Sequence, residues 1–236
     1  MNKKSNSLSL SSIKILVWNI YKGDGENFES YFNRHLENSD IMMMQEGFLN
    51  DSMIKLLGAS DLDYYMSVSF LMSNDIPTGT LTASKFLSGR MINQRTVDVE
   101  PFIRSPKTNM ISYFPIEGST KELLTINIHG MNFKRDPVYL MKQIRLALPY
   151  IQAHDGPIVF AGDFNTKNSL KLKAVDDFME ENGFSKIKWD PDNRTGKILD
   201  HFYYKGLKVL KSTLYPEDAG SDHPAMWVEF SVKIED

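Results

Sequence analysis

Residues 158–165 read IVFAGDFN, a short apolar run that ends abruptly in polar residues. The apolar part is typical of a buried β-strand. A buried carboxylate is costly unless it is paired or bound to a cation, so an aspartate at this strand end needs a partner. A Gly-Asp pair that interrupts a buried strand is better explained by a catalytic role than by a structural one. We therefore interpret Asp163 and Asn165 as candidate catalytic residues.

The same pattern recurs along the chain, each time with residues that bind metals or move protons. The other runs are ILVWN ending at Asn19, IMMMQE at Glu46, LLTINIH at His129 and KILDH at Asp200, and the residues Asp222-His223 precede the run AMWVEF. Each piece alone has an ordinary structural interpretation as a strand end, a turn or a helix cap. Together they predict a hard divalent cation on oxygen ligands. Zinc is not indicated, because no two of His129, His201 and His223 stand four residues apart.

Short β-branched or aromatic runs bounded by Gly, Pro, Asn or Asp predict about eleven strands, and amphipathic stretches predict three or four helices. The expected helices are 27–36, 136–148 and 169–182. Gly206 separates two strands and suggests a hairpin. This balance predicts an α/β sandwich of two packed mixed β-sheets with helices outside. The expected strands are 14–19, 41–45, 64–70, 79–83, 94–99, 109–114, 123–128, 158–161, 198–204, 207–214 and 225–232.

The composition is that of an ordinary folded chain with a small negative charge. Hydrophobic residues make up 42% and charged residues 24% of the 236 residues, which excludes global disorder. Lys and Arg number 27 and Asp and Glu 30, for a formal net charge of -3. This excludes a strongly basic surface but leaves a local basic patch open. With no cysteine, a disulfide framework, a thiolate metal site and a cysteine nucleophile are excluded.

No run approaches the ~20 apolar residues of a membrane span, and the first residues lack the apolar stretch of a signal peptide. We expect a flexible lead-in over residues 1–12 and a single domain over residues 13–236. We also expect a cytoplasmic monomer that needs neither a membrane nor a protein partner. Export by a route without a signal peptide remains open.

Taken in order, the motifs WN, QE, NxH, GDFN, LDH and SDH resemble those of the endonuclease/exonuclease/phosphatase family, which includes DNase I and exonuclease III. The resemblance runs over residues 13–230, and is greatest to the bacterial YafD-like branch. That branch is indicated by ILVWNIYK at 15–22, NIH at 127–129 with Asn132-Phe133, and YKGL at 204–207. The resemblance implies a DNase I-like fold, a four-layer sandwich of two packed mixed β-sheets flanked by helices.

The resemblance also implies a metal centre. Glu46 is implied as the first metal ligand, with Asn19 and Asp222 close to the same ion. The implied cofactor is Mg²⁺, with Mn²⁺ as a substitute. A few protein oxygens completed by water are what Mg²⁺ prefers.

Five catalytic side chains are implied beside these ligands. Asp163 would orient or deprotonate the attacking water, and Asn165 would donate to a non-bridging phosphate oxygen. His223 would lie at the scissile phosphate, with Asp200 fixing its tautomer. His129 would be a second imidazole that donates to the phosphate or the leaving group.

The implied activity is metal-dependent hydrolysis of a phosphate ester, and we expect a nuclease whose substrate is nucleic acid. The alternatives are a phosphodiesterase or phosphatase acting on a lipid or sugar phosphate, either sphingomyelinase-like or inositol-phosphate-like, and a non-catalytic binding module. One departure is Ser84-Lys85, where many members carry Ser-Arg or Ser-His, because lysine offers a point charge and no bidentate contact. Lys167, Lys171 and Lys173 form either a phosphate-facing patch or a solvated helix face.

Overall fold

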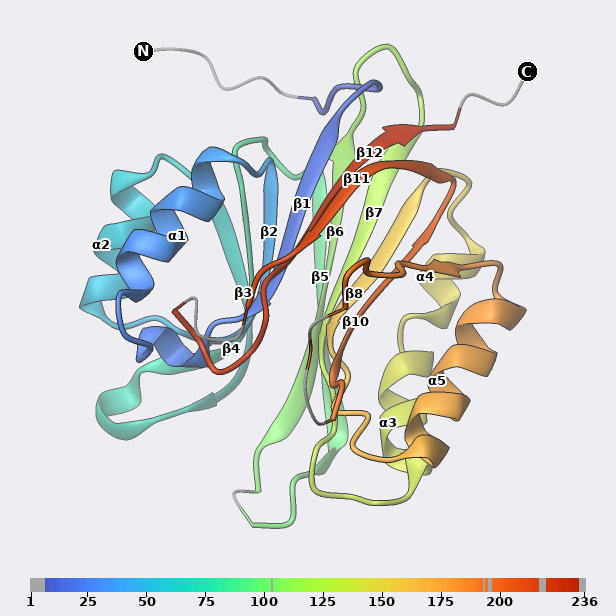
Figure 1. Cartoon of the computed structure of the whole chain (residues 1–236). Coiled ribbons are helices and arrows are strands. Elements are labelled where there is room, and N and C mark those ends of the chain that lie inside the picture. Colours follow the sequence, from blue (N-terminus) through green and yellow to red (C-terminus); the bar gives the residue numbers. More distant parts are fainter. Residues whose placement is uncertain (1–6, 103, 193, 195–196, 217–219, 234–236) are drawn as a thin grey trace.

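Two six-stranded β-sheets packed face to face form the centre of the computed structural model, and helices cover the outer face of each sheet (Figure 1). The structure describes residues 7–102, 104–192, 194, 197–216 and 220–233. The predicted four-layer α/β sandwich is confirmed by this arrangement.

The first sheet has the strand order β11-β12-β1-β2-β4-β3. It is mixed, because β1 runs parallel to β2 and antiparallel to β12. Its strands are β1 (Ile13–Asn19), β2 (Ile41–Phe48), β3 (Asp63–Leu71), β4 (Pro77–Ser84), β11 (Leu207–Leu214) and β12 (Met226–Val232).

The second sheet has the strand order β5-β6-β7-β8-β10-β9. It is also mixed, because β7 runs parallel to β8 and antiparallel to β6. Its strands are β5 (Arg90–Val99), β6 (Pro106–Pro115), β7 (Glu122–His129), β8 (Ile158–Asp163), β9 (Ser185–Lys186) and β10 (Asp200–Lys205).

The helices form the outer two layers (Figure 1). Helices α1 and α2 cover the first sheet, and α3, α4 and α5 cover the second. Among the described residues, no helix is long and apolar enough to cross a membrane. The helices are α1 (Phe28–Glu37), α2 (Asp51–Ala59), α3 (Pro137–Arg145), α4 (Leu148–Gln152) and α5 (Ser169–Glu181), with short 3-10 turns η1 (Tyr21–Gly23) and η2 (Ser73–Asp75).

Apolar side chains fill the spaces between these layers. Met43 packs between the two sheets with Val159, whereas Met42 and Met44 face α1 and α2. Successive side chains alternate across a strand, which explains why the methionine run divides between two layers. Phe160, the next residue after Val159, points to the opposite face of its sheet and packs under α3 and α5. Burying one such large side chain contributes about 1.5–3 kcal/mol, so the rim of the sheets rests on a firmly packed scaffold.

Strand register brings the polar strand ends together. Asn19 of β1 lies opposite Gln45 of the parallel strand β2, and His129 of β7 lies opposite Asp163 of the parallel strand β8. Strand β10 begins at Asp200, directly opposite Asp163. Parallel neighbours end at the same edge of a sheet, and the antiparallel strand β10 begins at the edge where β8 ends, so these polar residues gather at one rim.

Helix α2 has no counterpart among the expected helices. The sequence does contain an N-cap residue for this helix, Asn50. Its side chain accepts a hydrogen bond from the Met53 backbone N–H at 2.9 Å. Met53 and Leu57, four residues apart, are buried on one face of the helix. The helix is short, and this single apolar stripe is a weak signal in a sequence.

Gly206 does not form the expected hairpin. The strands on its two sides, β10 and β11, belong to different sheets, so the glycine carries the chain from one sheet to the other. Its φ of 69° lies in the left-handed region that glycine adopts without strain.

The flexible lead-in expected over residues 1–12 is too long. Leu8 is fully buried, pairs with Ile116 and packs in the core between the sheets. An apolar side chain removed from water in this way fixes the chain at that point. Residues 1–6 lie outside the described residues.

Candidate active site

Asp163, at the end of β8, lies in the middle of a group of polar side chains at the rim. Its carboxylate is buried, and its Oδ2 accepts a hydrogen bond from Asn19 Nδ2 at 3.2 Å. The same oxygen lies 3.7 Å from Nε2 of His129. The other oxygen, Oδ1, accepts from the Asn165 backbone N–H at 2.8 Å. Since Asn19 belongs to the first sheet and Asp163 to the second, the site spans both sheets.

Asp200 and His223 form a hydrogen-bonded pair, as the sequence predicts. Oδ2 of Asp200 lies 2.9 Å from Nδ1 of His223. His223 stands in the segment before β12, which two hydrogen bonds fasten to β1. Ser221 Oγ donates to the Asn19 carbonyl at 2.6 Å, and Trp18 Nε1 donates to the His223 carbonyl at 3.2 Å. The imidazole is therefore held against a carboxylate from the opposite sheet.

Glu46 lies near the end of β2, beside the same group. Its Oε1 is 3.5 Å from Asn19 Nδ2 and 4.0 Å from His129 Nε2, and its Oε2 is 2.8 Å from Nζ of Lys22. Its φ of 55° is uncommon for a residue with a side chain, and the pairing of β2 with β4 shifts register here. Such bulges redirect side chains at functional sites, and this one aims the carboxylate at the rim.

Asp222 directly precedes His223 on the segment before β12. Its side chain is exposed, and its Oδ1 lies 3.5 Å from Ser221 Oγ. Its role as a metal ligand stays a prediction. The structure brings the remaining predicted residues together, namely Asn19, Glu46, His129, Asp163, Asn165, Asp200 and His223.

The two imidazoles have different charges at neutral pH. Burial and the nearby Lys107 ammonium lower the pKa of His129 to about 4, so His129 is neutral. Burial also acts to lower the pKa of His223, but the hydrogen bond and charge of Asp200, together with Asp163, outweigh it and raise this pKa to about 10. His223 is therefore an imidazolium. Neighbouring groups whose pKa values are pushed apart are typical of acid–base sites.

The carboxylates also differ. Burial raises the pKa of Asp163, and the negative charge of Asp200 raises it further. Burial acts in the same direction on Glu46, but His129 and Lys22 outweigh it and lower the pKa of Glu46 to about 2. Glu46 is thus the carboxylate suited to hold a cation, and Asp163 is the one suited to accept a proton.

Lys107, on β6, belongs to the site although the sequence analysis did not single it out. Its Nζ lies 3.1 Å from Nε2 of His129 and 3.9 Å from Oε1 of the buried Glu100. A lysine has only donors, so Nε2 of His129 accepts here and its proton resides on Nδ1. The ammonium is then the cation beside His129. Lys85, the cation noted in the sequence, instead donates to the Glu37 carbonyl at 3.1 Å.

Replacing Lys107 by methionine should raise the pKa of His129 from about 4 towards its ordinary value. The change keeps the apolar stem and removes a charge that disfavours the imidazolium, whereas burial remains, so the recovery is partial. NMR titration of the imidazole measures the shift, with Lys85→Met as the matched control. An unaltered His129 pKa in Lys107→Met would contradict the assigned charge coupling.

The donors at the rim fit a hard divalent cation. Ligand atoms of Asp163, Asp200 and His223 lie within 4.8 Å of one another. Nδ1 of His223 is engaged by Asp200 and Oε2 of Glu46 by Lys22, each at 2.9 Å or less. Oε1 of Glu46, whose contacts are 3.5 Å or longer, is therefore the freer ligand atom. The Lys22 ammonium, 2.8 Å from Glu46, occupies a position where positive charge is stabilised. Carboxylate oxygens in such numbers suit Mg²⁺ or Mn²⁺.

Saturating Mg²⁺ should raise the Tm of the wild-type protein by about 5–10 °C. A ligand at ~100 times its Kd contributes about 2.7 kcal/mol, and each ~1 kcal/mol moves Tm by about 2–4 °C in a chain of this size. The Glu46→Gln variant should respond much less, because it lacks the charged ligand. Differential scanning fluorimetry, with NaCl at matched ionic strength, makes the comparison. Equal shifts in both proteins would place the ion elsewhere.

Gly162, the glycine of the GDFN motif, has a structural role that the sequence pattern does not reveal. A Cβ at Gly162, where φ is 141°, would collide with the Ile128 carbonyl of β7. The glycine thus allows β8 to pair closely with β7. Asn165 donates from Nδ2 to the Gly130 carbonyl at 3.0 Å and to Asp163 at 3.3 Å. In this structure Asn165 is a positioning residue for Asp163, and its amide is not free for the predicted phosphate contact.

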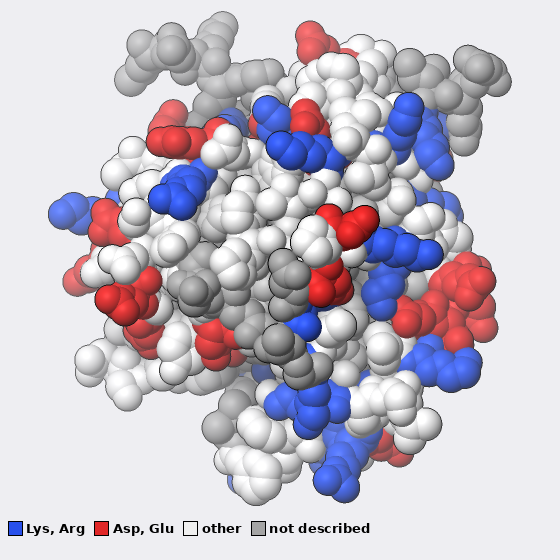
Figure 2. Space-filling model, in the orientation of Figure 1, with Lys and Arg blue, Asp and Glu red and all other residues white. Residues whose placement is uncertain are grey.

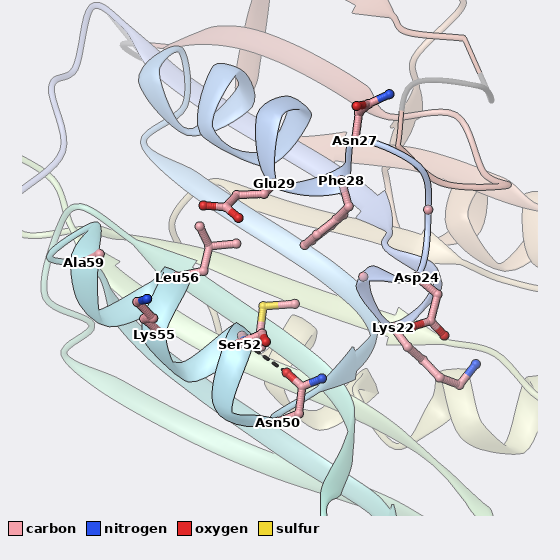
Figure 3. Close-up of a pocket in the computed structure, with 13 residues that line it drawn as sticks. Lys22, Asp24, Asn27, Phe28, Glu29, Asn50, Ser52, Lys55, Leu56 and Ala59 are labelled. Atoms are coloured by element: carbon pink, nitrogen blue, oxygen red, sulfur yellow. Dashed lines mark hydrogen bonds between the residues drawn. The ribbon is translucent and has the colours of Figure 1, made fainter.

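A pocket of about 570 Å³ lies beside this centre, between the η1–α1 segment and α2 (Figure 3). Lys22 and Asp24 lie at one end and Lys55 and Leu56 at the other. Lys22 also forms the ion pair with Glu46, so it connects the pocket to the centre. Among the described residues that line it, none belongs to the predicted catalytic set. The pocket therefore lies next to the predicted catalytic residues and does not contain them.

The fold and the acid–imidazole rim define a class of phosphoester hydrolases, and comparison with known proteins identifies it. Residues 16–223 match the Endonuclease/Exonuclease/phosphatase family, and the chain belongs to this family. The resemblance seen in the sequence motifs is confirmed.

Individual relatives and structures agree with this assignment. The chain is 30% identical over 224 residues to a UPF0294 protein of Vibrio vulnificus (strain YJ016), covering 93% of this chain and 77% of that protein. The human nocturnin catalytic domain with bound sulfate anion superposes with a TM-score of 0.71 at 14% identity, covering 96% of this chain and 96% of that one. An endonuclease/exonuclease/phosphatase family protein from Leptotrichia buccalis C-1013-b gives a TM-score of 0.67 at 17% identity, covering 95% and 100%. These two structural similarities show the fold.

Proposed function

We propose that this protein is a divalent-metal-dependent hydrolase that cleaves phosphodiesters of nucleic acid with an activated water. The observation that carries the proposal is the arrangement around Asp163. A buried carboxylate with a raised pKa lies between a neutral imidazole and, through Asp200, a protonated one. Family membership supplies the reaction class, and the cations Lys22 and Lys107 at the rim suit an anionic substrate.

In the proposed reaction, Asp163 orients the attacking water and accepts its proton. The His223 imidazolium faces the phosphate and stabilises the charge that develops on its oxygens, or gives its proton to the leaving oxygen. Asp200 holds the His223 ring in place and stabilises its charge, through the 2.9 Å hydrogen bond. The Lys107 ammonium beside His129 attracts a further phosphate oxygen.

A bound Mg²⁺ or Mn²⁺ would be held by Glu46, beside Asn19, and would polarise the phosphoryl oxygens. Asn19 also donates to both Glu46 and Asp163, at 3.5 and 3.2 Å. We therefore assign Asn19 the role of keeping the cation-binding carboxylate and the water-binding carboxylate at a fixed separation. Asn165 supports the same geometry from the other side of Asp163.

A parallel substrate screen tests this proposal. Purified protein with Mg²⁺ or Mn²⁺ would be offered plasmid DNA, RNA, sphingomyelin and inositol phosphates, each with an EDTA control. Cleavage of DNA or RNA that EDTA abolishes is the expected result. Hydrolysis of only the lipid or only the inositol phosphates would favour the alternative phosphodiesterase or phosphatase, and inactivity on all four would contradict the proposed enzyme.

A further inference from the structure

We propose that two loops beside the catalytic centre form a subsite for the flank of a single-stranded nucleic acid, binding its phosphates and one of its bases. The loops are residues 130–136, between β7 and α3, and residues 164–168, between β8 and α5. The inference rests on the proposed function, because it names the substrate of the same centre. It adds a binding site outside the catalytic residues themselves.

A pocket of about 490 Å³ between these loops is lined by cations. The chain as a whole has a net charge of -3, so this gathering is a local feature and not a result of composition. No Asp or Glu is among the described residues that line the pocket. Figure 2 shows Lys and Arg side chains together at the lower edge of the molecule, where Figure 1 shows the connections into α3 and α5. The lining cations are Lys134, Arg135, Lys167, Lys171 and Lys197.

An exposed aromatic pair lies among these cations. The Phe133 side chain is 49% exposed, and its ring meets that of Phe102, which is 80% exposed, edge to face at 5.7 Å. Nζ of Lys167 lies 5.8 Å from the centre of the Phe133 ring. Cations that follow a phosphate backbone, together with aromatic rings on which bases stack, are typical of single-strand binding surfaces. A duplex offers no free base face, so the pair favours a single strand.

The loop that carries Phe133 is held firmly by two buried charges. The fully buried Glu100 accepts hydrogen bonds from the backbone N–H groups of Asn132 and Phe133, at 2.6 and 3.0 Å. The buried Lys171 ammonium donates to the carbonyls of Asn132 and Asn165, at 3.2 and 3.4 Å. Lys171 thus ties the two loops to each other. A surface fixed before the ligand arrives loses less conformational entropy on binding.

Asn132 supplies an independent sign of a ligand. Its Oδ1 is buried and has no hydrogen-bond partner among the described residues. Such an orphaned acceptor is costly and fits an N–H or O–H donor of a ligand. A phosphodiester has no donor, whereas a base edge or a sugar hydroxyl has one. A lone acceptor on a residue that lines the pocket therefore suits a nucleoside better than a phosphate alone.

The subsite continues directly from the catalytic centre. The loop with Phe133 follows His129 at the end of β7, and Lys167 donates its backbone N–H to the Asn165 carbonyl at 2.8 Å. A strand whose scissile phosphate lies at Asp163 would therefore pass over these loops with a neighbouring nucleotide.

Fluorescence anisotropy in EDTA measures binding without cleavage. The probe is fluorescein-labelled oligothymidylate of twelve nucleotides, titrated at several NaCl concentrations. The double variant Arg135→Ala/Lys167→Ala removes one exposed cation from each loop, and Lys121→Ala/Lys208→Ala removes two exposed cations elsewhere as the charge-matched control. Arg135→Ala/Lys167→Ala should weaken binding about tenfold. It should also reduce the slope of log K against log salt by about 1.4, since each single-strand phosphate contact contributes about 0.7. The control should match the wild type.

The aromatic part is tested separately. Phe133→Ala should weaken binding of the oligonucleotide by at least about fivefold, and Phe133→Trp should retain it, because stacking needs a ring. An abasic oligomer should not distinguish Phe133→Ala from wild type. Equal affinity and slope for the two double variants would overturn the phosphate part, and an unchanged affinity in Phe133→Ala would overturn the base contact. Tighter binding to anionic lipid vesicles with the same dependence on Phe133 would overturn the nucleic-acid assignment.

Failure of this inference is distinguishable from failure of the proposed function. Hydrolysis of bis(4-nitrophenyl) phosphate by the wild type with Mg²⁺ tests the catalytic centre without any flank. Hydrolysis together with equal binding by all variants would reject the subsite and keep the enzyme. Variant-dependent binding with no hydrolysis of any phosphoester would reject the enzyme and keep the subsite.

Discussion

Replacing Glu46 by glutamine is expected to lower the rate of phosphodiester hydrolysis by at least about 10²-fold, the scale on which loss of one charge-stabilising group acts. Glutamine keeps the size and the hydrogen-bonding capacity of the side chain and removes its charge. Glu46 is ionised well below neutral pH, with a pKa of about 2, so the charge removed is a full one. Steady-state kinetics with Mg²⁺ measures the loss, and EDTA should abolish the wild-type reaction.

The control for this prediction is Glu181→Gln, which removes an exposed carboxylate at the end of α5. Its activity should equal that of the wild type. Circular dichroism should show that Glu46→Gln is folded, because the variant also loses the ion pair with Lys22. Full wild-type activity in EDTA, or full activity of a folded Glu46→Gln protein, would reject the metal-dependent mechanism.

Replacing His223 by alanine is expected to lower turnover by about 10²–10⁴-fold, the contribution of a positioned acid or base. Asp200→Asn should also impair turnover, because an amide cannot stabilise the imidazolium. The same variant should lower the pKa of His223 from about 10, since the Asp200 hydrogen bond and charge are what raise it against burial. NMR titration of the metal-free protein reads this shift directly.

The titration tests the electrostatic coupling of the pair, and turnover tests its catalytic role. A folded Asp200→Asn protein with a lowered His223 pKa and wild-type turnover would make the pair purely structural. His154→Gln is the matched control, because His154 lies far from the rim and contacts the Glu122 carbonyl at 3.0 Å. It should leave turnover unchanged. A His223→Ala variant with wild-type turnover would remove His223 from the mechanism.

Strand-end residues such as Asp163 and Asp200 could be predicted because each interrupts an apolar run, and such interruptions are visible in a linear sequence. The convergence of these residues follows from strand pairing. β7 and β8 run parallel and end together, and β10 runs antiparallel to β8, so its first residue lies beside the end of β8. Lys107 could not be predicted in this way. It stands near the start of β6, where a lysine is ordinarily solvated, and it is buried only because β6 pairs with β7 beside His129.

The hydrogen-bond partners of the site's side chains could not be predicted from the sequence either. The GDFN pattern indicates that Asn165 belongs to the site, but its amide hydrogens are used by Gly130 and Asp163, which depends on a left-handed φ of 53°. The same holds for Lys22, which stands in the sequence after Trp18-Asn19 and turns back to Glu46 through a φ of 60°. Local backbone reversals of this kind decide contacts that spacing alone does not reveal.

The crossing of the chain between the sheets sets an order of events during translation. Strand β10, with Asp200, is made before the chain returns through Gly206 to the first sheet, and His223 becomes available only afterwards, fastened to β1 just ahead of β12. A nascent chain that has not yet been made as far as residue 223 therefore lacks this imidazole, although Asn19, Glu46, His129, Asp163 and Asp200 have already been synthesised. The candidate site is thus completed by the segment that precedes β12, after all the strands that carry its other members have been made.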